Sequence, residues 1–262
     1  MTSGTSPGYL SGKKYLVLGV ANERSIAWGI SQALAREGAE LALTYVNEAI
    51  ERRVKPLAAE LKCETVLPCD VSSDESLDKL FSDLKSRWGT LDGIVHSVAY
   101  AEKEDLANRF SMTTRSGFRT ALDVSAYSLI AVASRGLPLM QEKGGSILTL
   151  SYLGSQRVVE NYNVMGVAKA ALESSVRYLA YDLGANNIRV NAVSAGPIKT
   201  LAAAGIPHFR ELLASFAARS PLKRNVTVDD VAQSAVFYLS PASSGITGEV
   251  TYVDCGFNIL GL

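Results

Sequence analysis

The 262-residue chain contains few histidines and cysteines, which narrows the chemistry it can perform. The two histidines, His96 and His208, lie far apart without a neighbouring cysteine, so neither is assigned to a metal site or a catalytic triad. The three cysteines lack the paired spacing of zinc ligands, and their odd number argues against a disulfide framework. We interpret Cys63, Cys69 and Cys255 as small buried side chains in a reducing compartment, and we predict no metal site.

The charge balance and the short apolar runs exclude further classes of protein. The chain has 26 basic and 26 acidic residues without a long block of either sign, so no nucleic-acid-binding surface is expected. No apolar run reaches the roughly 18 residues of a transmembrane helix, and we predict a soluble, cytoplasmic protein. Residues 1–9 lack the charged start and apolar centre of a signal peptide and are predicted to form a flexible tail. Residues 10–262 are predicted to form a single domain, since the chain is 47% hydrophobic and can bury a substantial core.

Short apolar runs alternate with helical patterns along the chain. Each run has the length of a buried strand, and amphipathic segments of helical period separate the runs. Strands are predicted at residues 14–19, 39–46, 65–70, 91–98, 146–150, 189–193 and 249–253, and helices at 26–37, 48–61, 73–88, 121–137, 161–183 and after Thr227. This order predicts an α/β fold, a single-domain Rossmann-type doubly wound parallel sheet with helices on both faces.

Two tyrosines and a lysine form the candidate catalytic group. Tyr162 and Lys169 are seven residues apart in a predicted helix, which places the phenol and the ammonium on one face. A nearby ammonium favours the phenolate and makes the phenol a better proton donor to a developing oxyanion. The alternative is a solvated face whose lysine stem covers apolar surface. Tyr152 favours a site, because it follows a strand and ligands of open α/β sheets bind at the carboxyl ends of strands.

The turn after the first strand is the candidate phosphate site. Gly19 permits a sharp turn, Gly29 permits close packing of the next helix, and Ser25 lies near the start of that helix. Free N–H groups and the helix dipole suit a pyrophosphate there. The regular G-x-G-x-x-G fingerprint is absent, so an ordinary strand-to-helix turn is the competing interpretation.

The ends of the second and third strands favour NADH over NADPH. Residues 45–48 contain no lysine or arginine for a 2′-phosphate, although Arg52 and Arg53 lie one turn further on. After the third strand, Asp70 could accept from the adenine amino group while Val71 contacts the ring. A helix cap is the other common use of such an aspartate.

Together these features resemble the short-chain dehydrogenase/reductase superfamily. Ordinary members carry a tyrosine four residues before the lysine and a serine thirteen residues before that tyrosine, whereas Met165 and Tyr152 stand at these positions here. This pattern and the segments 151–155 (SYLGS), 162–169 (YNVMGVAK) and 248–254 (GEVTYVD) are similar to the bacterial NADH-dependent enoyl-acyl-carrier-protein reductase branch, over residues 10–262. Tyr100 and Glu102 depart from that branch, where phenylalanine and proline are common.

The resemblance implies a role for each of a set of residues. The implied catalytic residues are Tyr152, Tyr162 and Lys169. The implied NADH-binding residues are Gly19, Ser25, Ile26, Val46, Asp70, Val71, Val98, Lys169, Ile198, Lys199, Thr200, Leu201 and Ala202. The implied substrate-binding residues are Ala101, Tyr152, Tyr162, Met165, Ala202, Ile206 and Phe209.

The implied reaction is NADH-dependent reduction of the trans-2 double bond of an enoyl thioester, carried by acyl-carrier protein or CoA, in the last step of the fatty acid elongation cycle. Tyr162 would hydrogen-bond the thioester oxygen, and Lys169 would bind the nicotinamide ribose. Residues 200–217 combine small and apolar side chains with Gly205 and Pro207. We predict that they form a substrate lid, against the alternative of a core helix with a break.

Two other functions remain open at this point. One is a carbonyl-reducing member of the same superfamily, which Met165 in the usual tyrosine position disfavours. The other is a non-catalytic dinucleotide sensor, which would need the cofactor but not the acid residues. The resemblance also implies a homotetramer, with the apolar residues 257–262 and the Tyr/Lys helix as candidate interfaces.

Overall fold

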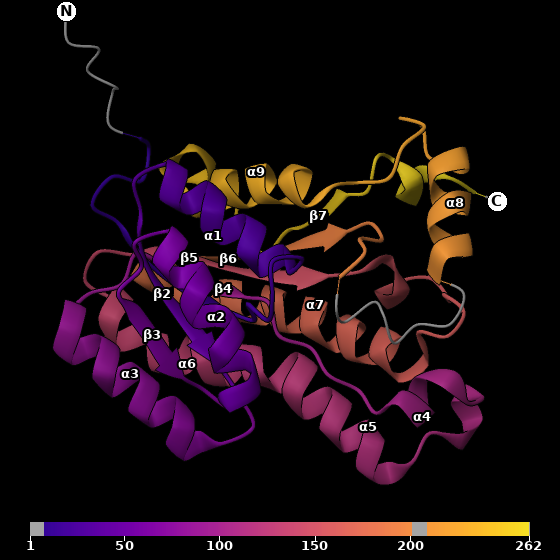
Figure 1. The fold of residues 1–262 in the computed structure, drawn as a ribbon, viewed down its shortest axis with the longest axis horizontal. Coiled ribbons are helices and arrows are strands. Elements are labelled where there is room, and N and C mark those ends of the chain that lie inside the picture. The colour runs from indigo at the N-terminus through magenta and orange to yellow at the C-terminus, as the bar shows by residue number, and fades with distance from the viewer. Residues whose placement is uncertain (1–7, 201–208, 262) are drawn as a thin grey trace, which may run out of the picture.

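The computed structural model describes residues 8–200 and 209–261. Within these residues a seven-stranded sheet has the order β3-β2-β1-β4-β5-β6-β7, with every neighbouring pair parallel (Figure 1). The strands are β1 (Lys14–Leu18), β2 (Glu40–Tyr45), β3 (Thr65–Pro68), β4 (Gly93–His96), β5 (Gly145–Ser151), β6 (Ile188–Ala195) and β7 (Val250–Val253). The predicted doubly wound parallel sheet is confirmed.

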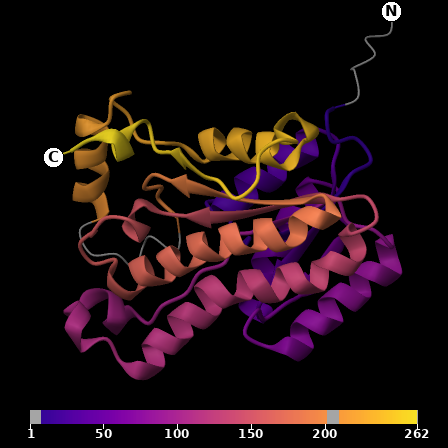
Figure 2. The ribbon, with the colours of Figure 1, turned by 180° about the vertical axis from the view of Figure 1, so that it is seen from behind.

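Helices cover both faces of this sheet. They are α1 (Ile26–Arg36), α2 (Glu48–Glu60), α3 (Asp74–Trp88), α4 (Lys103–Ala107), α5 (Arg115–Leu122), α6 (Ser128–Met140), α7 (Asn163–Leu183), α8 (Phe209–Arg219) and α9 (Val228–Leu239). Figure 1 shows α1 and α9 together on one side, and Figure 2 shows α6 and α7 side by side on the other.

Side chains along β1 point alternately to the two faces of the sheet, and the hydrophobic core has one cluster on each face. Leu16 and Leu18 face a cluster formed with α3, α6 and α7, whereas Tyr15 and Val17 face a cluster formed with α1, α2 and α9. Alternate residues of a strand point to opposite faces, so a strand buried on both faces must be apolar throughout. This explains why the strands read as continuous apolar runs rather than as alternating patterns.

Side-chain caps fix the starts of several helices, among them α2, α3 and α9. The side chain of Asn47 accepts from Ile50 N at α2, and that of Ser73 accepts from Ser76 N at α3. At α9, Thr227 and Asp230 form a reciprocal capping box. Each cap satisfies an amide that the helix leaves unpaired and contributes about 1 kcal/mol. The predicted starts of these helices agree with the structure to within a residue.

The segment before β5 differs from its predicted form. A single helix was expected at 121–137, but helical structure begins at Arg115 and continues through a π-helical turn, Asp123–Tyr127, to the end of α6. The early start is set by Thr114, whose side chain accepts from Gly117 N. Residues 115–120 are mostly polar, so no apolar period marks this helix in the sequence. The short helix α4 was missed for the same reason.

Candidate active site

The carboxyl ends of the parallel strands bring the predicted cofactor residues to one edge of the sheet. Gly19 follows β1, Val46 follows β2, Val98 lies just beyond β4, and Ile198–Thr200 follow β6. Asp70 and Val71 come soon after β3. In the sheet, β1 pairs with β2 on one side and with β4 on the other. The strands that follow β1 therefore extend first in one direction and then, from β4 on, in the opposite direction. Ligands of such folds bind at this switch point.

Gly19 has a backbone and surroundings that only glycine tolerates. Its φ is +101°, and a Cβ atom there would lie 1.9 Å from the carbonyl oxygen of Ser97. Gly29 also lacks room, because its Cβ would lie 2.1 Å from Cγ1 of Val228 in α9. The first glycine therefore sets the turn, and the second sets the approach of α1 to α9.

Ser25 shapes the turn instead of capping α1. Its buried Oγ accepts from the amides of Ala21 and Asn22 at 3.0 and 3.1 Å, and it makes no side-chain cap bond. The Ser25 hydroxyl thus stabilises the turn by bonding its backbone amides. The first N–H groups of α1, beginning at Ile26, are left as free donors of a helix N-terminus. Such donors and the helix dipole suit a pyrophosphate.

The β2 and β3 ends provide an apolar side chain, Val46, and a carboxylate acceptor, Asp70, for the adenosine half. Val46 is 54% exposed. The nearby guanidinium of Arg52 is 2.5 Å from Glu48, with which it forms an ion pair. Asp70 accepts from the backbone amide and the hydroxyl of Ser72, so it holds its own turn and leaves further acceptor sites outward. Val71 packs against the core cluster behind it.

Tyr152 and Tyr162 meet directly. Their ring centroids are 4.9 Å apart with an interplanar angle of 68°, an edge-to-face contact. Tyr152 follows β5, and its hydroxyl is buried without a hydrogen-bond partner among the described residues. Tyr162 immediately precedes the first helical residue of α7, between two asparagines with positive φ, Asn161 at 60° and Asn163 at 38°. The predicted helix start at 161 is thus two residues early.

Asn163 is a residue that sequence reasoning missed. Its side-chain amide donates to the carbonyls of Leu106 and Asn108 at 2.7 and 2.8 Å, which links the start of α7 to the end of α4. The left-handed backbone is tolerated because asparagine adopts it more readily than other residues with a side chain. The two asparagines flanking Tyr162 were the signal available in the sequence.

Lys169 is buried with its ammonium directed at the end of β5. The side chain is 6% exposed, and Nζ donates to the carbonyl of Leu150 at 2.7 Å. Burial lowers the pKa of Lys169 to about 8, while the carboxylate of Glu173 acts to raise it. An ammonium has three N–H groups, and this bond uses one. The remaining donors suit the hydroxyls of a ribose.

The tyrosines have raised pKa values, contrary to the sequence-based expectation for Tyr162. Burial, and then electrostatic interaction with Tyr152 and Glu173, raise the pKa of Tyr162 far above its ordinary value. Burial alone raises the pKa of Tyr152 to about 12. Lys169 does not lower the pKa of Tyr162 in this structure, because desolvation of the phenolate is the largest effect. Both hydroxyls therefore keep their protons near pH 7 and are able to donate hydrogen bonds.

The predicted substrate residues have different positions. Met165 is buried in the first turn of α7, Ala101 is half-buried, and Phe209 is the first residue of α8. Leu201, Ala202 and Ile206 lie outside the described residues. Of the predicted lid, the part in α8 is described, and there the buried Phe216 stacks on Phe257 with centroids 3.7 Å apart.

His96 is a buried structural side chain. Nδ1 lies 2.9 Å from Oγ1 of Thr149, and Nε2 lies 2.8 Å from Oγ of Ser128. Burial and then the charge of Lys169 lower the pKa of His96 to about 3, so the imidazole is neutral near pH 7. Within residues 8–200 and 209–261, no group of three or more His, Cys, Asp or Glu side chains is arranged to hold a metal ion.

His96 makes the fold sensitive to acid. The unfolded chain protonates this imidazole near pH 6.5, whereas the folded chain does so only near pH 3, so lowering the pH between these values favours unfolding. The stability lost is on the order of 5 kcal/mol. We expect His96→Gln, which cannot titrate, to show a flatter pH dependence of the unfolding free energy in urea over this range. Equal slopes for the two proteins would contradict this.

Comparison with known proteins decides the family. A family model described as "Enoyl-(Acyl carrier protein) reductase" matches residues 19–258.

This chain belongs to the enoyl-(acyl carrier protein) reductase family.

The relatives of this reductase family extend over nearly the whole chain. An enoyl-[acyl-carrier-protein] reductase [NADH] of Neisseria meningitidis is 52% identical, covering 97% of this chain and 98% of the relative. The structure of the Anaplasma phagocytophilum reductase in complex with NAD has a TM-score of 0.94 at 49% identity, covering 98% of both chains. The Bacillus cereus reductase with NADP⁺ and an indole naphthyridinone has a TM-score of 0.95 at 51% identity, covering 97% of this chain and all of that one. The resemblance inferred from the Tyr152, Tyr162 and Lys169 pattern is confirmed at the level of this reductase family.

Proposed function

We propose that this chain is an NADH-dependent enoyl-[acyl-carrier-protein] reductase. It reduces the trans-2 double bond of enoyl thioesters in the last step of the fatty acid elongation cycle. The observation that carries this proposal is the contact between Tyr152 and Tyr162 just before α7, with the ammonium of Lys169 buried in the same helix. The matched family model and the NADH-dependent relatives support it.

The residues at the carboxyl edge fit a nicotinamide dinucleotide. Lys169 has N–H groups left for the ribose, the Gly19 turn and the start of α1 offer amides to the pyrophosphate, and Asp70 retains acceptor capacity for adenine. Val98, Ile198, Lys199 and Thr200 border the same edge. NADH, when bound, supplies the hydride for the β-carbon of the thioester.

We assign to the two tyrosines the stabilisation of the negative charge that develops on the thioester oxygen. Tyr162 holds its proton and donates a hydrogen bond to this oxygen, which stabilises the enolate. Tyr152, with a buried hydroxyl lacking a partner among the described residues, orients the same end of the substrate. Both tyrosines are half-buried, and hydrogen bonds from such donors are stronger than those made in open water.

The rest of the substrate site is proposed along the start of α7 and the segment before α8. Met165, whose amide donates to the Tyr162 carbonyl, is proposed to provide apolar surface for the substrate, as are Ala101 and Phe209. Ala202 and Ile206 lie outside the described residues, and their contact with the substrate, like the lid at residues 200–217, stays a prediction from the resemblance. The carrier is acyl-carrier protein or CoA.

An activity assay separates this function from its rivals. We expect loss of NADH absorbance on adding a trans-2-enoyl thioester, and no loss with a 3-ketoacyl thioester. Turnover of the ketoacyl compound would instead support a carbonyl reductase. Cofactor binding without oxidation by either substrate would support a dinucleotide sensor, and both results would contradict the proposal.

We expect NADH to be preferred over NADPH by at least about tenfold in kcat/KM. Val46 offers no charge for a 2′-phosphate, and Arg52 is held by Glu48. A relative with NADP⁺ shares 51% identity, so the overall fold does not decide the preference. The measurement is steady-state kinetics with both cofactors. Val46→Arg is expected to raise NADPH use, and equal kcat/KM values in the unaltered enzyme would refute the expectation.

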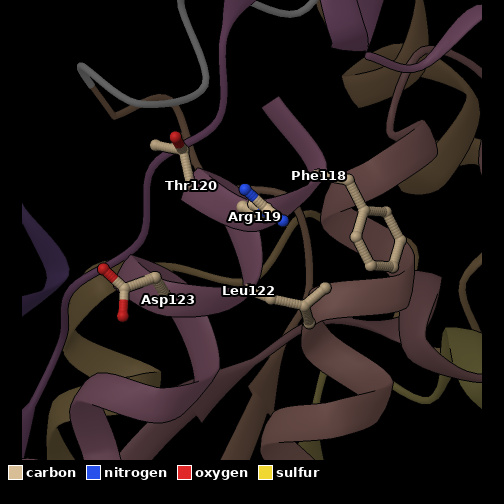
Figure 3. Close-up of a pocket in the computed structure, with 5 residues that line it drawn as sticks. All are labelled: Phe118, Arg119, Thr120, Leu122 and Asp123. Atoms are coloured by element: carbon tan, nitrogen blue, oxygen red, sulfur yellow. The ribbon is translucent and has the colours of Figure 1, made fainter. Parts of the chain in front are cut away.

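We also propose a homotetramer in the cytoplasm. Apolar side chains are exposed on the helices that cover one side of the sheet, including Phe118 of α5, Ile130 of α6 and Tyr178 and Tyr181 of α7. On α5 a shallow depression is lined by Phe118, Arg119, Thr120, Leu122 and Asp123, and Phe118 and Leu122 project to the same side (Figure 3). Contact between copies of the chain would cover these groups.

In the described part of the chain, no helix has the length and apolar character needed to cross a membrane.

A further inference from the structure

Glu173 is a buried acid close to the site, and the reaction described above does not use it. Its side chain is 4% exposed, and it lies one turn after Lys169 in α7. Among the described residues, no lysine, arginine or histidine nitrogen forms a salt bridge with it within 4.0 Å. Burying a carboxylate without a close cation costs free energy, so its retention needs a reason.

The carboxylate holds both ends of the segment that carries Tyr152. Oε1 of Glu173 accepts from the hydroxyl of Ser151 at 2.6 Å and from the hydroxyl of Ser155 at 2.6 Å. Ser151 directly precedes Tyr152, and the amide of Ser155 donates to the Tyr152 carbonyl at 3.0 Å. Hydroxyl-to-carboxylate bonds of this length are among the stronger ones in proteins. One oxygen atom therefore fixes the backbone on both sides of the tyrosine.

The turn of α7 between Lys169 and Glu173 also positions the Lys169 ammonium. Lys169 bonds the carbonyl of Leu150 and Glu173 bonds the hydroxyl of Ser151, so two residues one helical turn apart hold two adjacent residues at the end of β5. A carboxylate four residues after a lysine lies on the same helix face. Its negative charge favours the ammonium over the neutral amine in a site where burial acts in the opposite direction.

We propose that Glu173 is a positioning residue of the reductase site. It holds the Tyr152 segment through Ser151 and Ser155, and it places a carboxylate one helical turn from the ammonium of Lys169. This inference rests on the proposed function. The other titratable groups near Lys169 do not replace this charge: His96 of β4 is neutral, and Tyr162 carries its proton. Burial and then the charge of Glu173 raise the pKa of Tyr252 in β7, so Tyr252 is also uncharged near pH 7.

The test compares variants that separate the charge from the hydrogen bonds. Glu173→Gln keeps the shape and an oxygen that can accept from both serines but removes the charge. Ser155→Ala removes one hydrogen bond and keeps the charge. Asp182→Asn is the matched control, since it neutralises an exposed carboxylate of the same helix. The value of kcat/KM for a trans-2-enoyl thioester is measured over a pH range around 8, the approximate pKa of Lys169.

We expect the alkaline fall in activity of Glu173→Gln to move to lower pH by about one unit. Ser155→Ala should keep the pH profile and lose about tenfold in kcat, because Tyr152 is less well held. Asp182→Asn should match the unaltered enzyme. An unchanged pH profile in folded Glu173→Gln would overturn the proposal. If that variant does not fold, Ser155→Ala decides, and an unchanged kcat would overturn it.

Failure of the proposed function gives a different result. In that case the unaltered enzyme and Asp182→Asn would both leave NADH unoxidised with the enoyl thioester. The pH dependence of NADH affinity, followed by cofactor fluorescence, would then test the role of Glu173 without turnover. A shift of that dependence to lower pH in Glu173→Gln supports the role, and its absence refutes it.

Discussion

Replacing Tyr162 with phenylalanine is expected to lower kcat about 100- to 1,000-fold with little change in NADH affinity. The phenol is the proton-bearing donor directed to the developing oxyanion, and burial keeps it protonated. Phenylalanine retains the edge-to-face packing against Tyr152, so the fold should be preserved. The measurement is steady-state kinetics with an enoyl thioester at saturating NADH.

Two further variants define what this loss means. Tyr152→Phe should cost less than Tyr162→Phe, because the role proposed for Tyr152 is to orient the substrate. Tyr9→Phe removes a hydroxyl from an exposed residue outside the site and should leave kcat unchanged. If Tyr162→Phe retained full turnover, Tyr162 would not be the donor to the thioester oxygen.

Replacing Lys169 with methionine is expected to weaken NADH binding about 100-fold and to lower kcat/KM at least as much. Methionine keeps the buried stem but removes the N–H groups proposed to bind the ribose hydroxyls. The cost to stability should be small. The carbonyl of Leu150 loses its donor at about 1–3 kcal/mol, but the desolvation cost of the ammonium is also removed.

Titration of NADH fluorescence and thermal unfolding measure the two effects separately. In the unaltered enzyme, NADH affinity should fall as the pH rises through about 8, because the ammonium form of Lys169 is lost there. Lys169→Met should show no such fall. Lys143→Met, at an exposed lysine after α6, is the control that should change neither property. Equal NADH affinity in Lys169→Met and the unaltered enzyme would show that this ammonium does not hold the cofactor.

The sequence predicted the fold well because its signals are local. Each apolar run contains a strand, central ones such as β1 and β4 are buried on both faces, and helix caps such as Asn47, Ser73 and Thr227 mark starts within a residue. A parallel sheet then places the residues after every strand at one edge, which brings Gly19 close to Ser97 from the end of β4. The helix at Arg115 and α4 were missed because neither has an apolar period.

The residues of the candidate site could be predicted from the sequence, but their pKa values could not. Tyr152, Tyr162 and Lys169 could be chosen from spacing and resemblance, but the high pKa of Tyr162 comes from burial, which no local pattern reveals. Glu173 was missed for a similar reason. A glutamate in a long helix is usually solvated, and its partners Ser151 and Ser155 are 22 and 18 residues away in sequence.

The central claim is that the site reduces a carbon–carbon double bond with hydride from NADH. The most direct measurement uses NADH deuterated at both C4 positions with a trans-2-enoyl thioester, followed by NMR of the product. The account predicts a saturated thioester with deuterium on the β-carbon. A product with deuterium on any other carbon, or recovery of the enoyl thioester unchanged while NADH stays bound, would contradict it.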